Sequence, residues 1–146
     1  MTFFIFLLAC AAAASTGVIF KPGAWYAALV KPSFTPPNWA FPLAWTLIYL
    51  LLAWAGYCLS LIPGSQTVLA LWAAQIALNT LWTPVFFGAH QLLAGMVIIV
   101  LLWITVAAMV ALAVRLDLIT GLILFPYLAW LCVAAALNFS IWRNNR

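Results

Sequence analysis

The chain has 146 residues, of which 70% are hydrophobic and only 4% are charged, and its formal net charge is +4. No soluble domain of this length could bury so much apolar surface, so the composition excludes a soluble globular protein and indicates a membrane protein. The small positive charge comes from a few scattered lysines and arginines and gives no support for nucleic-acid binding.

Hydrophobic stretches follow one another along the chain, and each has the roughly 20 residues that carry a helix across about 30 Å of hydrocarbon. They are continuously apolar, whereas the strands of a membrane barrel alternate, so helices are expected. We predict an all-α membrane protein with a single domain, residues 1–146, built as a bundle of five transmembrane helices. Its approximate spans are 2–20, 41–62, 66–89, 92–114 and 118–142.

The first span, which opens with MTFFIFLLAC, has two interpretations. A signal peptide with a lipoprotein-like cleavage box at Cys10 is one of them. The stretch lacks a basic N-terminal region, however, and the apolar run continues past Cys10. We therefore favour a retained helix.

The connection at residues 21–40 is long and irregular, whereas the others are short and make consecutive helices antiparallel neighbours. Its prolines forbid a regular helix and its aromatic residues give it an apolar underside. These residues are Pro22, Pro32, Pro36, Pro37, Trp25, Tyr26, Phe34 and Trp39. The loop could be a lid that folds back over the mouth of the bundle, with Lys21 and Lys31 at the lipid headgroups, or an aromatic belt that anchors it at the interface.

The few charged residues predict the orientation in the membrane. Five spans place the two termini on opposite sides, and one side then carries most of the basic residues: Lys21, Lys31, Arg143 and Arg146. The other side has Arg115, offset by Asp117. The positive-inside rule puts the loop 21–40 and the C-terminus in the cytoplasm and the N-terminus outside.

The third span has two faces. Gln75 and Asn79 share a helical stripe with Trp72, Trp82 and Phe86. Amides are costly in hydrocarbon when they lack partners, so this face is expected to point into the bundle or a cavity.

The opposite face of the third span carries small residues, Ala70, Ala73 and Ala77. Such a face lets another helix approach closely. The second helix belongs either to a partner chain or to a neighbour in the same bundle, and we favour a homodimer.

Aromatic residues also share faces in the second and fifth spans. Trp45 and Tyr49 lie one turn apart, and Trp130, Ala134 and Asn138 follow Pro126 and Tyr127, where the proline should kink or loosen the helix. If these faces meet that of the third span, they enclose an apolar pocket suited to a flat hydrophobic ligand. Ordinary aromatic packing is the alternative.

Several kinds of chemistry have no support. The sole acidic residue, Asp117, lies at a helix start, where it pairs with Arg115 or caps the helix. A proton-coupled antiporter needs a carboxylate at mid-membrane, and a hydrolase needs more acid–base groups than one histidine and this aspartate. Cys10, Cys58 and Cys132 lie in separate spans, which predicts neither a disulfide framework nor a metal site.

Three stretches of the chain resemble a known family. KPSFTPPNWAFPLAWTLIY, AAQIALNTLWTPVFFG and PYLAWLCVAAALNFSIWRNN are similar to segments of the TspO/MBR family, the tryptophan-rich sensory proteins and the mitochondrial translocator protein or peripheral-type benzodiazepine receptor. The resemblance implies a five-helix bundle, commonly a homodimer, that binds protoporphyrin IX and other tetrapyrroles beneath its first loop. Some members bind benzodiazepine-type drugs or cholesterol. Positions that match the family's ligand site are Trp25, Tyr26, Trp45, Asn79, Trp82, Trp130 and Ala134.

The favoured function is therefore a membrane receptor or binding protein for porphyrins, with transport or sensing of tetrapyrroles as its role and no further cofactor required. Tyr49 joins the ligand-binding residues, and Lys21 and Lys31 are expected to pair with the propionates. An alternative is a light-dependent porphyrin-degrading enzyme that uses Trp45 and Trp130, as the family resemblance implies, and another is a structural or regulatory subunit. Phe139 replaces the central tyrosine of the family's cholesterol motif, so sterol binding is not expected.

Overall fold

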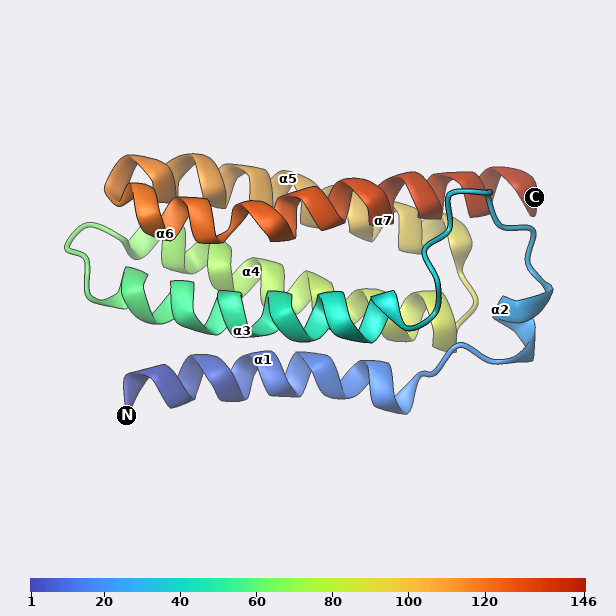
Figure 1. The fold of residues 1–146 in the computed structure, drawn as a ribbon, viewed down its shortest axis with the longest axis horizontal. Coiled ribbons are helices and arrows are strands. Elements are labelled where there is room, and N and C mark those ends of the chain that lie inside the picture. The colour runs from blue at the N-terminus through green and yellow to red at the C-terminus, as the bar shows by residue number, and fades with distance from the viewer.

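The computed structural model describes residues 1–146 and confirms the all-α prediction (Figure 1). It contains five helical segments long and apolar enough to cross a membrane. The elements are α1 (Thr2–Ile19), the short α2 (Ala24–Ala28), α3 (Ala40–Ser60), α4 (Gln66–Thr83), the π-helical turn η1 (Pro84–Gly88), α5 (Leu92–Leu116), α6 (Leu118–Ile123) and α7 (Phe125–Asn144). The long helices run side by side along the longest axis, and the two termini lie at opposite ends (Figure 1).

The fourth span is one continuous helix, α5, but the third and fifth are modified at prolines. In the third, α4 passes into η1 at Pro84, where the Ala89 N–H donates to the Pro84 carbonyl at 2.8 Å in a widened π turn. In the fifth, the helix is interrupted at Leu124 between α6 and α7, directly before Phe125 and Pro126. The loosening predicted near Pro126 is therefore found, because proline lacks a backbone N–H and disfavours a helical residue before it.

At the start of α6, Asp117 takes one of its two expected roles, which were pairing with Arg115 and capping the helix. Its side chain accepts a hydrogen bond from the Thr120 backbone N–H at 2.7 Å and so caps the helix. Hydrogen bonding from the Thr120 side chain, together with that from its backbone N–H, lowers the pKa of the Asp117 carboxyl.

The core lies between α3, α4, α5 and α7, where fully buried aliphatic residues such as Leu52, Leu102 and Leu131 belong to one cluster. α1 occupies one edge of the bundle (Figure 1) and buries only Cys10 and Ala13. It packs closely at its first half, where a Cβ on Gly56 would lie 2.5 Å from the Phe6 ring. Toward its second half α1 borders a cavity, which is described below.

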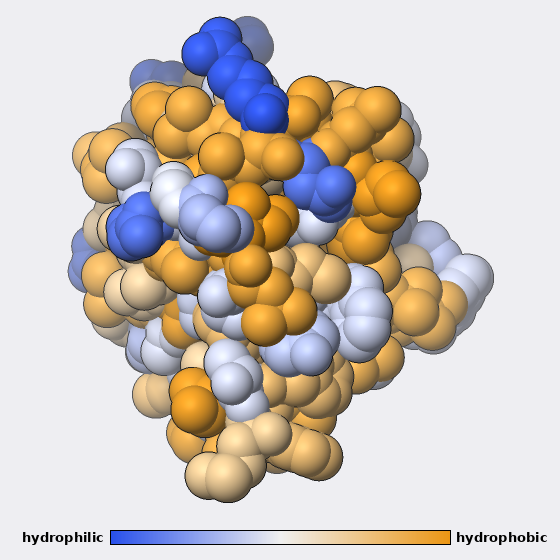
Figure 2. All heavy atoms as spheres, turned by 90° about the vertical axis from the view of Figure 1, so that its left-hand side faces the viewer, coloured by the Kyte–Doolittle hydropathy of each residue, from blue (hydrophilic) through white to orange (hydrophobic).

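The outer surface is apolar, as expected for side chains that face lipid. Large hydrophobic residues such as Leu8, Leu47 and Val97 are more than half exposed. Figure 2 shows the end of the bundle that carries the N-terminus, where hydrophilic side chains are few. These features, with the five long helices, make the chain an integral multi-pass membrane protein.

The opposite end of the bundle holds the connection between α1 and α3, here called the first loop (residues 21–39), which includes α2. The C-terminus lies at this same end (Figure 1). Lys21, Lys31, Arg143 and Arg146 are therefore gathered at one end, as the predicted topology requires.

Candidate ligand-binding cavity

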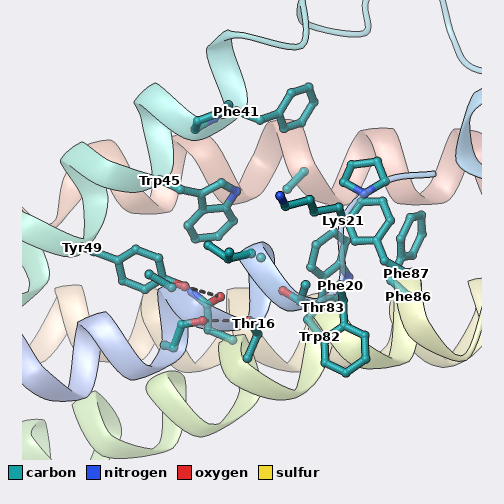
Figure 3. A pocket seen from close by; sticks show the side chains of 18 of the residues that line it. Thr16, Phe20, Lys21, Phe41, Trp45, Tyr49, Trp82, Thr83, Phe86 and Phe87 are labelled. Carbon is teal, nitrogen blue, oxygen red and sulfur yellow. Dashed lines mark hydrogen bonds between the residues drawn. The ribbon is translucent and has the colours of Figure 1, made fainter.

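A cavity of about 1140 Å³ lies between α1, α3, α4 with η1, and α7, and the first loop forms part of its wall (Figure 3). Most of its lining residues are apolar or aromatic, with a few amides and hydroxyls. The aromatic ones are Phe20, Tyr26, Phe41, Trp45, Tyr49, Trp82, Phe86, Phe87 and Trp130. A cavity of this size and lining is typical of sites for large, mainly apolar ligands.

The wall from α3 is built by residues four apart. Phe41, Trp45 and Tyr49 follow one another along one face of this helix and point into the cavity (Figure 3). The Trp45 ring lies 5.7 Å from that of Tyr49, and the Phe41 ring lies 5.7 Å from that of Trp130 on α7. Phe41 thus connects the aromatic faces of α3 and α7.

On α7, Trp130 and Ala134 line the cavity one turn apart, with Asn138 one turn further on. The indole N–H groups of Trp130 and Trp82 are buried without a hydrogen-bond partner, so both residues are held by ring packing.

The wall from α4 and η1 depends on the π turn. The rings of Trp82 and Phe86 are stacked at 5.0 Å with an interplanar angle of 18°, and Phe87 stands edge-on to Trp82 at 5.6 Å. Phe86 and Phe87 both line the cavity, although they are adjacent in the chain. Phe87 also meets Tyr26 of the first loop at 5.3 Å.

Two side chains of the cavity wall, Tyr49 and Asn79, and two behind it, Tyr127 and Gln75, form a hydrogen-bonded chain across three helices. The Tyr49 hydroxyl donates to Asn79 Oδ1 at 3.2 Å, and Asn79 Nδ2 donates to the Tyr127 hydroxyl at 2.9 Å. The Tyr127 hydroxyl in turn donates to Gln75 Oε1 at 2.9 Å. The polar face predicted for the third span therefore turns inward, and it fixes α3, α4 and α7 relative to one another.

The first loop contributes Tyr26 to the cavity but turns Trp25 away from it. Trp25 stacks on His90 at 4.1 Å and 14°, and its edge meets Phe86 at 5.9 Å, so it holds the loop against the turn before α5. Trp25 does not reach the cavity wall. Burial raises the pKa of the Tyr26 hydroxyl, which therefore stays neutral at physiological pH.

The two lysines of the first loop occupy different surroundings. Lys21 lines the cavity, and Figure 3 shows its side chain extending into it, while its ammonium group makes no hydrogen bond to the protein. Lys31 also lines the cavity, but its Nζ donates to the carbonyls of Ala27 and Leu29 at 3.3 and 3.2 Å and lies 4.7 Å above the Tyr26 ring. The ammonium of Lys21 is thus free to meet an anionic ligand, whereas that of Lys31 holds the loop together.

The small-residue face of α4 points away from the rest of the chain. Ala70, Ala73 and Ala77 are all exposed, and no other helix of this chain covers them. No group of three or more His, Cys, Asp or Glu side chains could hold a metal ion.

Several cavity residues were not identified from the sequence. Phe41, Phe20 and Phe87 belong to the wall, and Thr83 adds a hydroxyl. The spacing of four between Phe41 and Trp45 was a readable signal for the first of them. Phe87 carried no such signal, because its position depends on the π turn.

Comparison with known proteins agrees with this architecture. Residues 4–143 match the model of the TspO/MBR family. The chain is 49% identical to protein CrtK of Rhodobacter capsulatus, over 98% of this chain and 92% of that protein. It is 44% identical to the tryptophan-rich sensory protein of Cereibacter sphaeroides, over 98% and 90% of the two chains, and 35% identical to the human translocator protein, over 83% and 75%.

Proposed function

Because the chain belongs to the TspO/MBR family, we propose that it is a membrane receptor for porphyrins such as protoporphyrin IX and for similar flat hydrophobic ligands. The observation that carries this proposal is the cavity of about 1140 Å³, with aromatic walls and the Lys21 ammonium extending into it. Transport or sensing of tetrapyrroles is the role we propose for it.

The cavity suits the size and the chemistry of a porphyrin. Its volume of about 1140 Å³ lies slightly above the roughly 300–1,000 Å³ of ordinary ligand pockets, which leaves room for a macrocycle. Trp45, Trp82 and Trp130 present indole rings on three helices, and each ring contact contributes about 0.5–1.5 kcal/mol beyond area burial. The propionates can form charge-assisted hydrogen bonds with Lys21.

The first test is a titration of the purified protein with protoporphyrin IX in the dark, followed by tryptophan fluorescence. We expect saturable quenching near one ligand per chain and weaker binding in Trp130→Phe. Trp54→Phe is the matched control, since Trp54 is 49% exposed and packs on Phe3 and Tyr57 away from the cavity. Absence of saturable binding in the wild type would refute porphyrin as the ligand.

The two lysines provide a sharper test of the binding mode. Lys21→Gln is expected to weaken protoporphyrin IX about three- to tenfold, the effect of losing one partly exposed charged hydrogen bond, and to leave an uncharged benzodiazepine-type ligand unaffected. Lys31→Gln should affect both ligands alike, because its ammonium binds carbonyls of the loop. Equal losses for both ligands in Lys21→Gln would argue against propionate pairing.

A second candidate function is light-dependent degradation of porphyrin. The observation that favours it is that Trp45 and Trp130 both line the cavity, where either could exchange an electron with a bound, photoexcited porphyrin. Illumination in the presence of oxygen should then bleach the porphyrin spectrum and yield a new product. If Trp45→Phe and Trp130→Phe form this product at the wild-type rate, the two tryptophans have no such role.

The assembly and the orientation are part of the proposal. We propose a homodimer formed through the exposed face of Ala70, Ala73 and Ala77, which Ala73→Leu should weaken in a cross-linking assay. The first loop and the C-terminus are proposed to be cytoplasmic and the N-terminus external, because the basic residues gather at the first-loop end. Reporter fusions at the two termini test this orientation.

A further inference from the structure

The C-terminal end of the chain is hydrogen-bonded to the first loop across 115 residues. The Val30 N–H donates to Asn145 Oδ1 at 2.9 Å, and Asn145 Nδ2 donates to the Val30 carbonyl at 3.0 Å. One side-chain amide therefore pairs with both polar groups of one backbone residue, in the manner of a neighbouring strand.

These two bonds are the only hydrogen bonds that join residues 21–36 to another part of the protein. The other bonds of this segment are local, such as Thr35 N–H to the Pro32 carbonyl at 3.1 Å. Its remaining long-range contacts are apolar or aromatic, chiefly Trp25 on His90 and Phe86, and Tyr26 on Phe87. The prolines of the loop remove donors and leave few alternatives. Asn145 therefore supplies the directional part of the attachment.

The attachment point lies next to the cavity. Lys31, which follows Val30, lines the cavity, and so do Tyr26 and Ala27 on the preceding turn. Asn145 is itself fixed, since its Nδ2 donates to the Ile141 carbonyl at 2.7 Å and its backbone N–H donates to the same carbonyl at 3.1 Å. Ile141 is buried and also lines the cavity. The hydrogen bonds of Asn145 thus connect Ile141, a cavity-lining residue of α7, to Val30 of the first loop.

We propose that Asn145 is a positioning residue of the binding site, a latch that holds the first loop over the cavity and sets the rate at which ligand enters and leaves. The consequence for ligand exchange rests on the proposed function, whereas the attachment of the loop does not. When the latch opens, the loop keeps its aromatic contacts with η1 and His90, so the fold and the cavity walls persist. Asn145 acts on the ligand through the loop and does not itself line the cavity.

Asn145→Ala tests the latch, and Asn144→Ala is the matched control. Asn144 has the same side chain at the adjacent position, but it is exposed, and its only side-chain hydrogen bond runs from its Nδ2 to Ser140 Oγ at 3.4 Å, so it makes no hydrogen bond to the loop. Hydrogen exchange of the Val30 amide is measured by mass spectrometry in detergent, together with association and dissociation rates of protoporphyrin IX by stopped flow and the unfolding temperature. Asn145→Asp keeps an acceptor for the Val30 N–H but loses the donor.

In Asn145→Ala the Val30 amide should exchange faster, because Asn145 Oδ1 is its acceptor. Two exposed hydrogen bonds are each of modest strength, so dissociation of protoporphyrin IX is expected to accelerate about tenfold, equivalent to about 1.4 kcal/mol. Association should accelerate as well, while the unfolding temperature changes little. Asn145→Asp should protect the Val30 amide partly, and Asn144→Ala should match the wild type in every measurement.

The outcomes separate this inference from the proposed function. Unchanged exchange of the Val30 amide in Asn145→Ala would overturn the latch, whatever the protein binds. Faster exchange with unchanged ligand rates would overturn its control of access. If the wild type does not bind protoporphyrin IX, the proposed function fails, and amide exchange still decides whether Asn145 positions the loop.

Discussion

Removing the Tyr127 hydroxyl tests whether the buried hydrogen-bonded chain stabilises the bundle. Tyr127 is 1% exposed, and its hydroxyl accepts from Asn79 Nδ2 and donates to Gln75 Oε1, both at 2.9 Å. In Tyr127→Phe both partners lose a bond, and Gln75, whose Nε2 already lacks a partner, is left with no side-chain hydrogen bond at all. Neither the lipid nor the protein interior can replace these bonds.

The expected loss is about 1–3 kcal/mol of unfolding free energy. The lower value comes from two bonds at the roughly 0.6 kcal/mol measured on average in membrane helices, and the upper value from leaving buried groups unsatisfied. Unfolding by denaturing detergent, followed by circular dichroism, gives the difference. The double variant Gln75→Leu with Tyr127→Phe should recover part of the loss, because replacing both partners by apolar groups removes the unsatisfied oxygen.

Tyr57→Phe is the matched control for this prediction. Tyr57 is partly buried and packs edge-on against Phe3 at 6.0 Å, and no hydrogen bond of its hydroxyl is found. Its loss should therefore cost little. If Tyr127→Phe is no less stable than Tyr57→Phe, the chain of amides and hydroxyls contributes nothing measurable, and the reasoning is wrong.

Two further predictions concern the connection of α5 to α6. Gly121→Ala should destabilise the protein by about 1–3 kcal/mol, because the added Cβ would lie 2.6 Å from the Val114 backbone nitrogen. Gly17→Ala is the control: no atom lies within 4 Å of its added Cβ, so this variant should be neutral or slightly stabilising in the same assay. The pKa of Asp117 is lower in the folded protein than the value of about 3.9 in the unfolded chain. Its ionised carboxylate therefore stabilises the fold at pH values above about 3.9, and this contribution is lost as the pH falls through the lower pKa of the folded state. In Asp117→Asn the side chain can still accept the Thr120 N–H, but it no longer titrates. The unfolding temperature of the variant should therefore fall less at acid pH than that of the wild type. An identical pH profile in the two proteins would contradict this.

Much of the architecture could be predicted from the sequence, because hydrophobic length and helical periodicity are local properties. The five spans follow from apolar stretches that match the thickness of a bilayer. The inward face of Gln75 and Asn79 follows from their spacing of four and from the cost of unpaired amides in hydrocarbon. The capping role of Asp117 was likewise one of the two roles expected from its place at a helix start.

Only the tertiary structure shows which residues of the first loop face the cavity and which hold the loop in place. Lys21 and Lys31 are equivalent in the sequence, but only the folded loop shows that carbonyls and the Tyr26 ring engage the ammonium of Lys31. Trp25 and Tyr26 are adjacent, yet one stacks on His90 and the other lines the cavity. The bond between Asn145 and Val30 joins residues 115 positions apart. Periodicity describes which side of a helix is apolar, whereas these contacts depend on where irregular segments from distant parts of the chain meet, and no local pattern encodes that.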